Sequence, residues 1–221
     1  MRKFQFHKND KMNFDNVLLT GASGKLGSLI SKLSIFNNLW NPSVEVFDIT
    51  SYNSLERFFD AHKIDAVIHC AALARMSICE NDPIAAINAN IIGTSNLVNA
   101  VIKKENMLKK PIRFVHISTD AVYDCSKGSY SEKGPCIPYN KYGWTKLGAE
   151  CAVNLLSNFC IIRTRFFNPE NIPFNESATD LYTSTIPINE LAFYIMDILN
   201  TEFVGTINVG KPSRSDFENY K

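Results

Sequence analysis

The six cysteines of this chain include no C-x-x-C pair, and its charged residues leave a formal net charge of only +1 over 221 residues. The first absence disfavours a zinc site built on paired cysteines. The second removes the basic excess that electrostatic binding of nucleic acid requires, so we expect no nucleic-acid partner. The chain also shows no signal-peptide pattern and no apolar run long enough to cross a bilayer. These absences predict no membrane association and a cytoplasmic, reducing location.

Neither an internal repeat nor a long linker interrupts the chain. The hydrophobic fraction of 45% is ordinary, and the length suits one domain with a substantial core. We therefore expect a single domain over residues 1–221, preceded at residues 1–15 by a polar, basic lead. The cysteines in apolar runs are expected to behave as small buried hydrophobic residues.

A glycine-rich turn follows the first predicted strand. The apolar run Asn16–Thr20 ends in Gly21-Ala22-Ser23-Gly24-Lys25-Leu26-Gly27, and a helical pattern follows it directly. Glycines at this spacing let the backbone approach a pyrophosphate, while the helix N-terminus supplies free amides. A tight turn without a ligand is the alternative. The strand before the turn and the helix after it favour dinucleotide binding.

Further apolar runs alternate with helical patterns along the chain. We expect strands at residues 44–49, 64–70, 112–117, 158–165 and 205–209, and helices at 53–62, 83–104, from 139 to about 150, 190–199 and 213–221. The longest helical pattern has its apolar face at Ile84, Ile87, Ile91, Leu97, Val98 and Val101. The alternation predicts an α/β fold, a Rossmann-type doubly wound parallel sheet.

Asp48 ends the predicted strand at residues 44–49, 21 positions after Gly27. This spacing is close to that of the acidic residue that binds the adenosine ribose in dinucleotide folds. The alternative is a helix N-cap, since Asp48 or the following Thr50 and Ser51 could start the helical pattern at residues 53–62.

Tyr142 and Lys146 lie four positions apart in a predicted helix, so both side chains share one face. An ammonium beside a phenol favours the phenolate and would lower the pKa of Tyr142, which suits a proton donor in carbonyl reduction. A Tyr and a Lys at this spacing also occur by chance. Thr119 follows a predicted strand at the edge where open α/β sheets bind ligands, although a hydroxyl there also serves as a cap.

Four stretches together resemble the extended short-chain dehydrogenase/reductase superfamily, in the sugar-nucleotide branch that includes dTDP-4-dehydrorhamnose reductase. They are residues 20–27, residues 90–97 (Asn-Ile-Ile-Gly-Thr-Ser-Asn-Leu), residues 116–123 (His-Ile-Ser-Thr-Asp-Ala-Val-Tyr) and residues 142–150. They occur in the family's order and at about its spacing.

The resemblance implies a role for individual residues. Thr119 matches the hydroxyl that binds the substrate carbonyl, Tyr142 the general acid, and Lys146 the residue that lowers the pKa of that acid and holds the nicotinamide ribose. An NAD or NADP cofactor is implied, with contacts from Gly21, Ser23, Gly24, Lys25, Leu26, Asp48, Ile49, Ala71, Ala72, Ala74, Tyr142 and Lys146.

The chain departs from the family pattern in two places. Relatives usually fit two strands between Gly27 and Asp48, where only one is convincing here; the other is shortened to residues 39–42 or missing, and the choice between NAD and NADP stays open. Relatives are also longer after Arg165. We therefore expect residues 166–221 to form a reduced substrate lobe whose sugar site is small, unusual or completed by another chain.

The resemblance supports two functions of different classes. The first is reduction of a keto group on a sugar nucleotide of the 4-keto-6-deoxyhexose type, in a chain that forms a homodimer or acts alone. A combined epimerase/reductase would need another acid or base, for which Cys79 and Glu80 are candidates. The second is a cofactor-binding regulatory subunit without turnover, because the regulatory subunit of methionine adenosyltransferase resembles the same branch. The intact set of Thr119, Tyr142 and Lys146 favours the enzyme.

Overall fold

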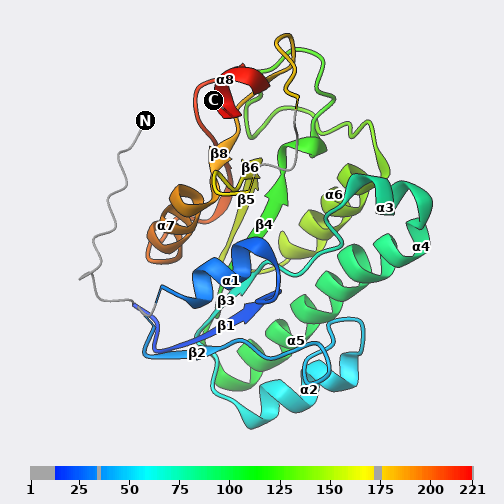
Figure 1. Cartoon of the computed structure of the whole chain (residues 1–221). Coiled ribbons are helices and arrows are strands. Elements are labelled where there is room, and N and C mark those ends of the chain that lie inside the picture. The colour runs from blue at the N-terminus through cyan, green and yellow to red at the C-terminus, as the bar shows by residue number, and fades with distance from the viewer. Residues whose placement is uncertain (1–12, 34–35, 172–175, 221) are drawn as a thin grey trace.

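The computed structural model describes residues 13–33, 36–171 and 176–220, so most of the expected N-terminal lead lies outside the described residues. Six parallel strands form a central sheet in the order β2-β1-β3-β4-β5-β9 (Figure 1). Along the chain they are β1 (Asn16–Thr20), β2 (Asn38–Trp40), β3 (Ala66–His69), β4 (Arg113–Thr119), β5 (Phe159–Thr164) and β9 (Gly205–Val209). The predicted Rossmann-type parallel sheet is confirmed.

Helices cover both faces of this sheet. On one face lie α1 (Lys25–Ser31) and α7 (Ile188–Leu199), and on the other lie α2 (Tyr52–Ala61), α5 (Gly93–Leu108) and α6 (Lys141–Val153) (Figure 1). Strands buried on both sides read as continuous apolar runs, which is why the central strands were recognisable in the sequence. None of the helices in the described ranges combines the length and apolar character needed to span a bilayer.

The strand expected at residues 44–49 is wrong. The strand in this region is the short β2, and residues 44–46 form a turn in which Ser43 O accepts from the amides of Val46 and Phe47. Val44 is 66% exposed, whereas Phe47 is buried. The side chain of Phe47 enters the core, but the backbone of this run is not paired in the sheet.

The helix expected at residues 83–104 is divided. It consists of α4 (Pro83–Ala86), the π-helix η1 (Ile87–Ile92) and α5, preceded by α3 (Met76–Asn81). The predicted apolar face holds for Leu97 and its neighbours but is wrong for Ile84, which is 70% exposed, and for Ile87. The wide turn of the π-helix changes the helical register, so residues before and after it do not share one face.

The chain after β5 is more structured than the sequence predicted. Strand β6 (Phe166–Phe167) pairs with β8 (Ile186–Pro187), and β7 (Tyr182–Thr183) pairs with β10 (Arg214–Ser215). The last described helix is α8 (Asp216–Tyr220). Figure 1 shows these small elements gathered beyond the end of the central sheet to which β4 and β5 point.

A buried ion pair holds α6 against the sheet. Arg163 of β5 donates from Nη2 to Glu150 Oε2 at 2.6 Å and from Nε to Oε1 at 3.1 Å. The same carboxylate accepts from the Ser118 hydroxyl of β4. The Glu150 and Arg163 side chains are only 3% and 7% exposed. One side chain of α6 thus contacts two adjacent strands.

Glu150→Ala is expected to lower the free energy of unfolding by about 3–5 kcal/mol, because it leaves the Arg163 charge buried without its partner. Chemical denaturation at neutral pH measures this. The matched control is Glu56→Ala, which breaks the surface pair with Lys103 and should leave stability almost unchanged. Equal effects of the two substitutions would contradict the structural role of the buried pair.

Candidate active site

The glycine-rich turn sits at the carboxyl end of β1, beside the end of β3. Gly21 has φ +71°, and a Cβ at this position would lie 2.6 Å from the backbone nitrogen of Ala71. A Cβ on Gly27 would lie 2.2 Å from the carbonyl oxygen of Gly21. Both glycines are therefore required by the close packing of the turn itself.

Gly24 is different, because the structure leaves more room around it. It precedes α1 in an extended conformation, and an added Cβ would approach only the Gly21 oxygen, at 3.2 Å. Ser23, Gly24 and Lys25 are exposed at the start of the helix, whereas the Leu26 side chain is in the core. This segment presents exposed backbone and one Lys at a helix N-terminus, a surface that fits a phosphate group.

The segment after β3 runs close to this turn. Ala71 donates its amide to Thr20 Oγ1 at 3.2 Å, and Ala72 is half-buried while Ala74 is exposed. Asn90 of the π-helix holds the middle of the segment, accepting from the Leu73 amide at 2.7 Å and donating to the Leu73 carbonyl at 3.1 Å. The small side chains leave the backbone accessible on the side away from these bonds.

Asp48 and Ile49 lie on the loop that leads into α2. Asp48 Oδ1 accepts from the Thr50 amide and the Thr50 hydroxyl, each at 2.8 Å, so the carboxylate closes a local turn. Of the three residues considered as the helix cap, Ser51 is the N-cap of α2, and Asp48 is not. Asn96 of α5 donates to the Ile49 carbonyl at 3.1 Å and holds the loop against the helix layer.

Thr119 and Tyr142 meet at the carboxyl edge of the sheet. Thr119 is the last residue of β4, and Tyr142 is the second residue of α6, whose N-cap Asn140 accepts from the Gly143 amide at 2.7 Å. Burial raises the pKa of Tyr142 to about 12, and the neighbouring Thr119 side chain opposes that rise. The pair thus provides a hydroxyl and a protonated phenol side by side.

Lys146 lies deeper, in the interior of the sheet–helix interface. Its ammonium is 3.3 Å from His116 Nε2, and burial lowers the pKa of Lys146 to about 8. Burial raises the pKa of Tyr142, and Lys146 is not among the groups that most affect it, so the role of Lys146 in lowering that pKa stays a prediction. The charges that most affect Tyr142 belong to Asp120, Cys79 and Arg165.

Two neutral histidines surround the Lys146 ammonium. Burial, followed by the Lys146 charge, lowers the pKa of His69 to about 3 and also holds that of His116 well below its usual range. His69 Nδ1 is 2.7 Å from Thr20 Oγ1, and its Nε2 is 2.9 Å from Thr94 Oγ1. His116 Nδ1 has no hydrogen-bond partner within the described part of the chain.

The two candidates for a second acid or base are already engaged. Cys79 is buried, and its thiol donates to the Leu73 carbonyl at 3.3 Å. Glu80 Oε1 accepts from the Lys141 amide at 2.7 Å and so lies at the start of α6. Both contacts are structural, and neither side chain is joined to Tyr142 by a hydrogen bond among the described residues.

Several residues that build the site were missed in the sequence. Glu150 and Arg163 are 13 positions apart and meet only because α6 packs on the sheet, while Asp120 and Arg165 are 45 positions apart and meet because β4 and β5 end at the same level. A signal existed for Asn90, since it stands among apolar residues in the predicted helix at residues 83–104. A buried amide in such surroundings requires partners, which Leu73 and Thr145 supply.

Residues 15–171 match the family model described as the RmlD substrate binding domain. The chain belongs to this family. The matched residues include the glycine-rich turn, Thr119, Tyr142 and Lys146, and the match ends shortly after β6.

Several known proteins are similar to part of this RmlD-family chain. The dTDP-4-keto-6-deoxy-D-glucose reductase of Streptomyces niveus is 35% identical over 144 residues, which are 63% of this chain and 47% of that protein. The methionine adenosyltransferase 2 subunit beta of Pongo abelii is 31% identical over 156 residues, 65% of this chain and 45% of that protein. The matched region therefore spans less than half the length of these relatives.

Solved structures resemble nearly the whole chain. A dTDP-4-dehydrorhamnose reductase from Clostridium acetobutylicum has a TM-score of 0.82 at 27% identity, covering 93% of this chain and 78% of that one. The dTDP-4-dehydrorhamnose reductase of Bacillus anthracis, solved in complex with NADP, has a TM-score of 0.80 at 25% identity and covers 96% of this chain and 79% of that one.

The buried ammonium predicts a specific pH dependence of stability in this RmlD-family chain. Because the pKa of Lys146 is about 8 when folded and about 10.5 in its ordinary state, the unfolded chain binds more protons between these values. The free energy of unfolding contributed by this group therefore rises with pH, by up to about 1.4 kcal/mol per pH unit.

Lys146→Met removes this titration. The stability of the natural chain relative to the variant should therefore increase from pH 8 to pH 10, as measured by urea denaturation of both proteins. A stability difference that stays constant over this range would contradict the assignment of Lys146 as a buried, destabilised ammonium.

Proposed function

We propose that the chain is an NAD(P)-dependent oxidoreductase that reduces a keto group on a sugar nucleotide of the 4-keto-6-deoxyhexose type. The observation that carries the proposal is the position of Thr119 beside Tyr142, at the same edge of the sheet as the glycine-rich turn. A hydrogen-bond donor, a proton donor and a phosphate-binding turn on one edge are what carbonyl reduction by a dinucleotide requires. The relatives from Streptomyces niveus and Clostridium acetobutylicum support the same class of reaction.

Each catalytic side chain has one role in this proposal. Thr119 donates a hydrogen bond to the keto oxygen and polarises the carbonyl. Tyr142 gives its phenolic proton to that oxygen as the carbon receives hydride, so the product is a hydroxyl group. Its high pKa keeps the phenol protonated until the alkoxide forms. Lys146 would hold the nicotinamide ribose, and its burial makes its charge effective over a short distance.

The cofactor in this proposal is NADP or NAD, which supplies the hydride when bound. The exposed backbone of residues 23–25 holds the pyrophosphate, and Gly21 and the backbone of Leu26 complete that turn. Asp48 and Ile49 lie toward the adenosine half, and Ala71, Ala72 and Ala74 run along the cofactor. The NADP complex of the Bacillus anthracis relative supports the choice of a nicotinamide dinucleotide as the cofactor.

Residues 166–220 form the substrate lobe in this proposal. The pairs β6–β8 and β7–β10 stand beyond the edge that carries Thr119, where a sugar nucleotide would approach Tyr142. The packing of α7 into the core supports a single domain that includes this lobe.

A regulatory subunit without turnover is the second candidate, favoured by the match to methionine adenosyltransferase 2 subunit beta. One measurement separates the two functions. Oxidation of bound NADPH or NADH on addition of dTDP-4-keto-6-deoxy-D-glucose, followed by nicotinamide fluorescence, supports the reductase. Cofactor binding without oxidation supports the subunit.

Gly24→Val is expected to weaken NAD(P) binding by at least about tenfold and to leave the fold intact, because its side chain would point into the phosphate surface and not into the protein. Calorimetric titration with NADPH and NADH measures the loss. In contrast, Gly27→Ala should lower the melting temperature, since its Cβ would overlap the Gly21 oxygen. Unchanged cofactor affinity in Gly24→Val would show that the glycine-rich turn does not contact the cofactor.

Tyr142→Phe is expected to reduce turnover by at least about 10²-fold, the scale of lost general acid catalysis, with little change in cofactor affinity. The control is Tyr139→Phe, because Tyr139 lies three positions earlier and is 58% exposed. Steady-state assays with NADPH and the keto sugar compare the two variants. Loss of activity in Tyr139→Phe but not in Tyr142→Phe would contradict the assignment of Tyr142 as the general acid.

A further inference from the structure

The sheet register places Asp120 and Arg165 side by side at the active edge. Thr119 at the end of β4 pairs with Thr164 at the end of β5. The next residue on each strand leaves the sheet at the same level, and Arg165 Nε donates to Asp120 Oδ2 at 2.8 Å. The Arg165 backbone is fixed by the Ile186 amide, which donates to its carbonyl at 2.9 Å.

Asp120 also contacts the catalytic hydroxyl. Thr119 Oγ1 donates to Asp120 Oδ1 at 3.3 Å and accepts from the Ala121 amide at 3.1 Å. One carboxylate oxygen therefore bonds Arg165 and the other bonds Thr119. Thr119 in turn neighbours Tyr142, so a continuous chain of contacts runs from the guanidinium to the phenol.

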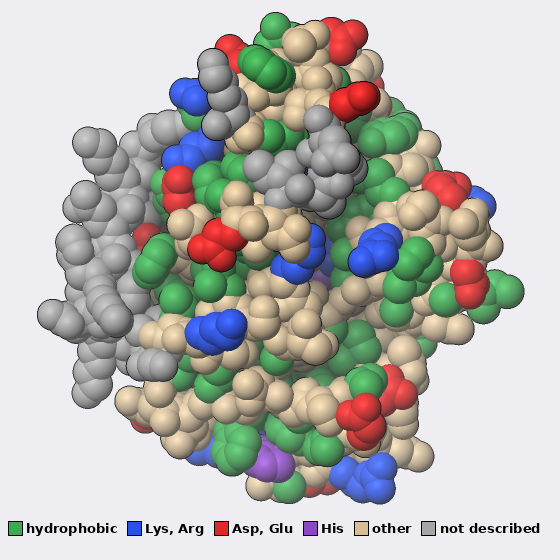
Figure 2. Space-filling model, viewed as in Figure 1, with side chains coloured by type: hydrophobic (Ala, Val, Ile, Leu, Met, Phe, Trp, Pro, Cys, Tyr) green, Lys and Arg blue, Asp and Glu red, His purple; other side chains and the backbone are tan. Residues whose placement is uncertain are grey.

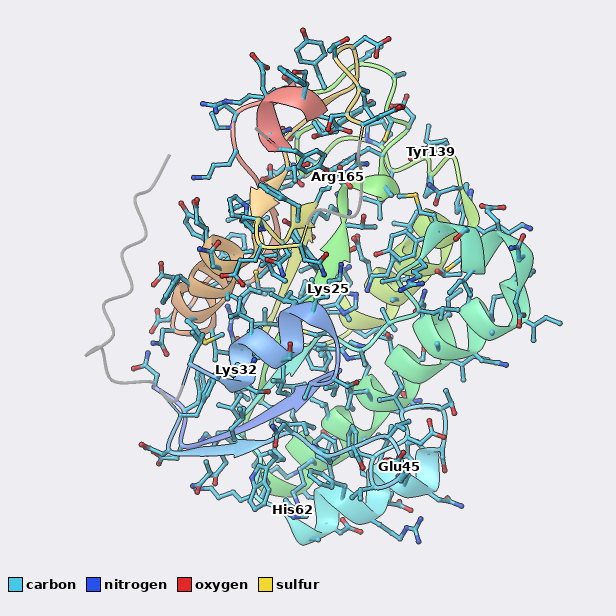
Figure 3. The ribbon with its side chains drawn as sticks, in the orientation of Figure 1. Lys25, Lys32, Glu45, His62, Tyr139 and Arg165 are labelled. Carbon is cyan, nitrogen blue, oxygen red and sulfur yellow. The ribbon has the colours of Figure 1, made fainter. Side chains whose placement is uncertain are left out.

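Arg163 lies in β5 and Arg165 directly follows the strand, and the two side chains bind different partners. Arg163 is buried and committed to Glu150 in the later part of α6. Arg165 lies higher, level with the start of α6, and retains 29% exposure. Figure 3 shows Arg165 on the same side of the molecule as Lys25 of the glycine turn, with Tyr139 across from it. In Figure 2 basic side chains also gather at the middle of this face.

We propose that the Asp120–Arg165 ion pair is a positioning and charge-balancing device for the Thr119–Tyr142 pair, in which Arg165 neutralises a carboxylate that would otherwise act on the phenol. This inference rests on the proposed reductase function for its catalytic meaning. Arg165 is thus a positive charge that lowers the pKa of Tyr142 in this structure.

The groups that act most on Tyr142 and Arg165 come from several elements of the described chain. Tyr142 is influenced by Thr119, Asp120, Cys79 and Arg165, and Arg165 is influenced by Asp120, Tyr139 and Cys125, with Tyr220 of α8 also within its field. Burial has the largest effect on the pKa of Tyr142. Asp120 also raises this pKa, and Arg165 lowers it. The two charges of the pair therefore act on the phenol in opposite directions.

The pair has a mechanistic consequence. A free Asp120 carboxylate would hold the Thr119 proton and disfavour loss of the Tyr142 proton, and both effects oppose reduction. With Arg165 bound, the carboxylate accepts less strongly, so the Thr119 hydroxyl can turn to the keto oxygen and Tyr142 can release its proton. Arg165 is a positioning residue in this account, since it acts through Asp120.

The test measures the phenolate fraction of Tyr142 without using activity. Nitration by tetranitromethane at pH 8 to 10, followed at each tyrosine by peptide mass spectrometry, proceeds through the phenolate. Arg165→Met should slow nitration of Tyr142 about tenfold and Asp120→Asn should speed it about tenfold, corresponding to pKa shifts of about one unit in opposite directions. The double variant should return close to the natural rate, and Arg165→Lys should depart from it less than Arg165→Met.

Tyr182, which is exposed, is the internal reference and should react equally in every variant. Arg165→Met should also lower kcat for reduction about tenfold while the affinity for NADPH stays unchanged, because the glycine turn is untouched. Shifts in the same direction for Arg165→Met and Asp120→Asn, or no shift in either, would overturn the inference. Opposite shifts in a protein that never oxidises NADPH would uphold the charge balance and reject the reductase function instead.

Discussion

The buried contact between Glu150 and Arg163 is the interaction on which the site depends. It joins α6 to β5, and through Ser118 to β4, at a point where all the groups involved are out of solvent. Tyr142 lies two helical turns before Glu150, so the ion pair determines where the phenol stands relative to Thr119. A helix attached only by apolar contacts could slide or rotate, whereas paired charges with several hydrogen bonds have one satisfactory geometry.

Low polarity in the interior gives the remaining groups their character. Lys146, His69 and His116 share a region without water-exposed surface, and burial disfavours the charged form of each. Electrostatic effects are larger in such surroundings than in water. The Lys146 ammonium therefore shifts the pKa of its neighbours more than it would at the surface. For the same reason, an unpaired carboxylate near Tyr142 would shift the pKa of the phenol.

The sequence predicted the parts of the fold that depend on local pattern. The strand at Asn16–Thr20, the glycine turn, the helix carrying Tyr142 and the strand at Gly205–Val209 are present where they were expected. The apolar run at residues 44–49 was misjudged, because a single buried Phe47 produces the same pattern as a short strand. The π-helix was not predicted either, since the apolar spacing at residues 83–104 is that of a regular α-helix.

For the candidate site, residue types were predictable but their mutual influence was not. Spacing placed Tyr142 and Lys146 on one helix, yet the sign of the pKa shift at Tyr142 depends on how deeply the phenol is buried. Arg165 carried no motif, and its contact with Asp120 exists only because two strands end at the same level.

The π-helix at Ile87–Ile92 also restricts how the length of this chain can change. Each residue of a regular helix turns the next by about 100°, so loss of one residue here would convert the wide turn to a regular one and rotate everything that precedes it. Asn90 would then face away from Leu73 while Leu97 kept its place in the core. Insertions and deletions in this family member are thus expected to fall in the loops around the sheet, and the segment between α4 and α5 to keep its residue count.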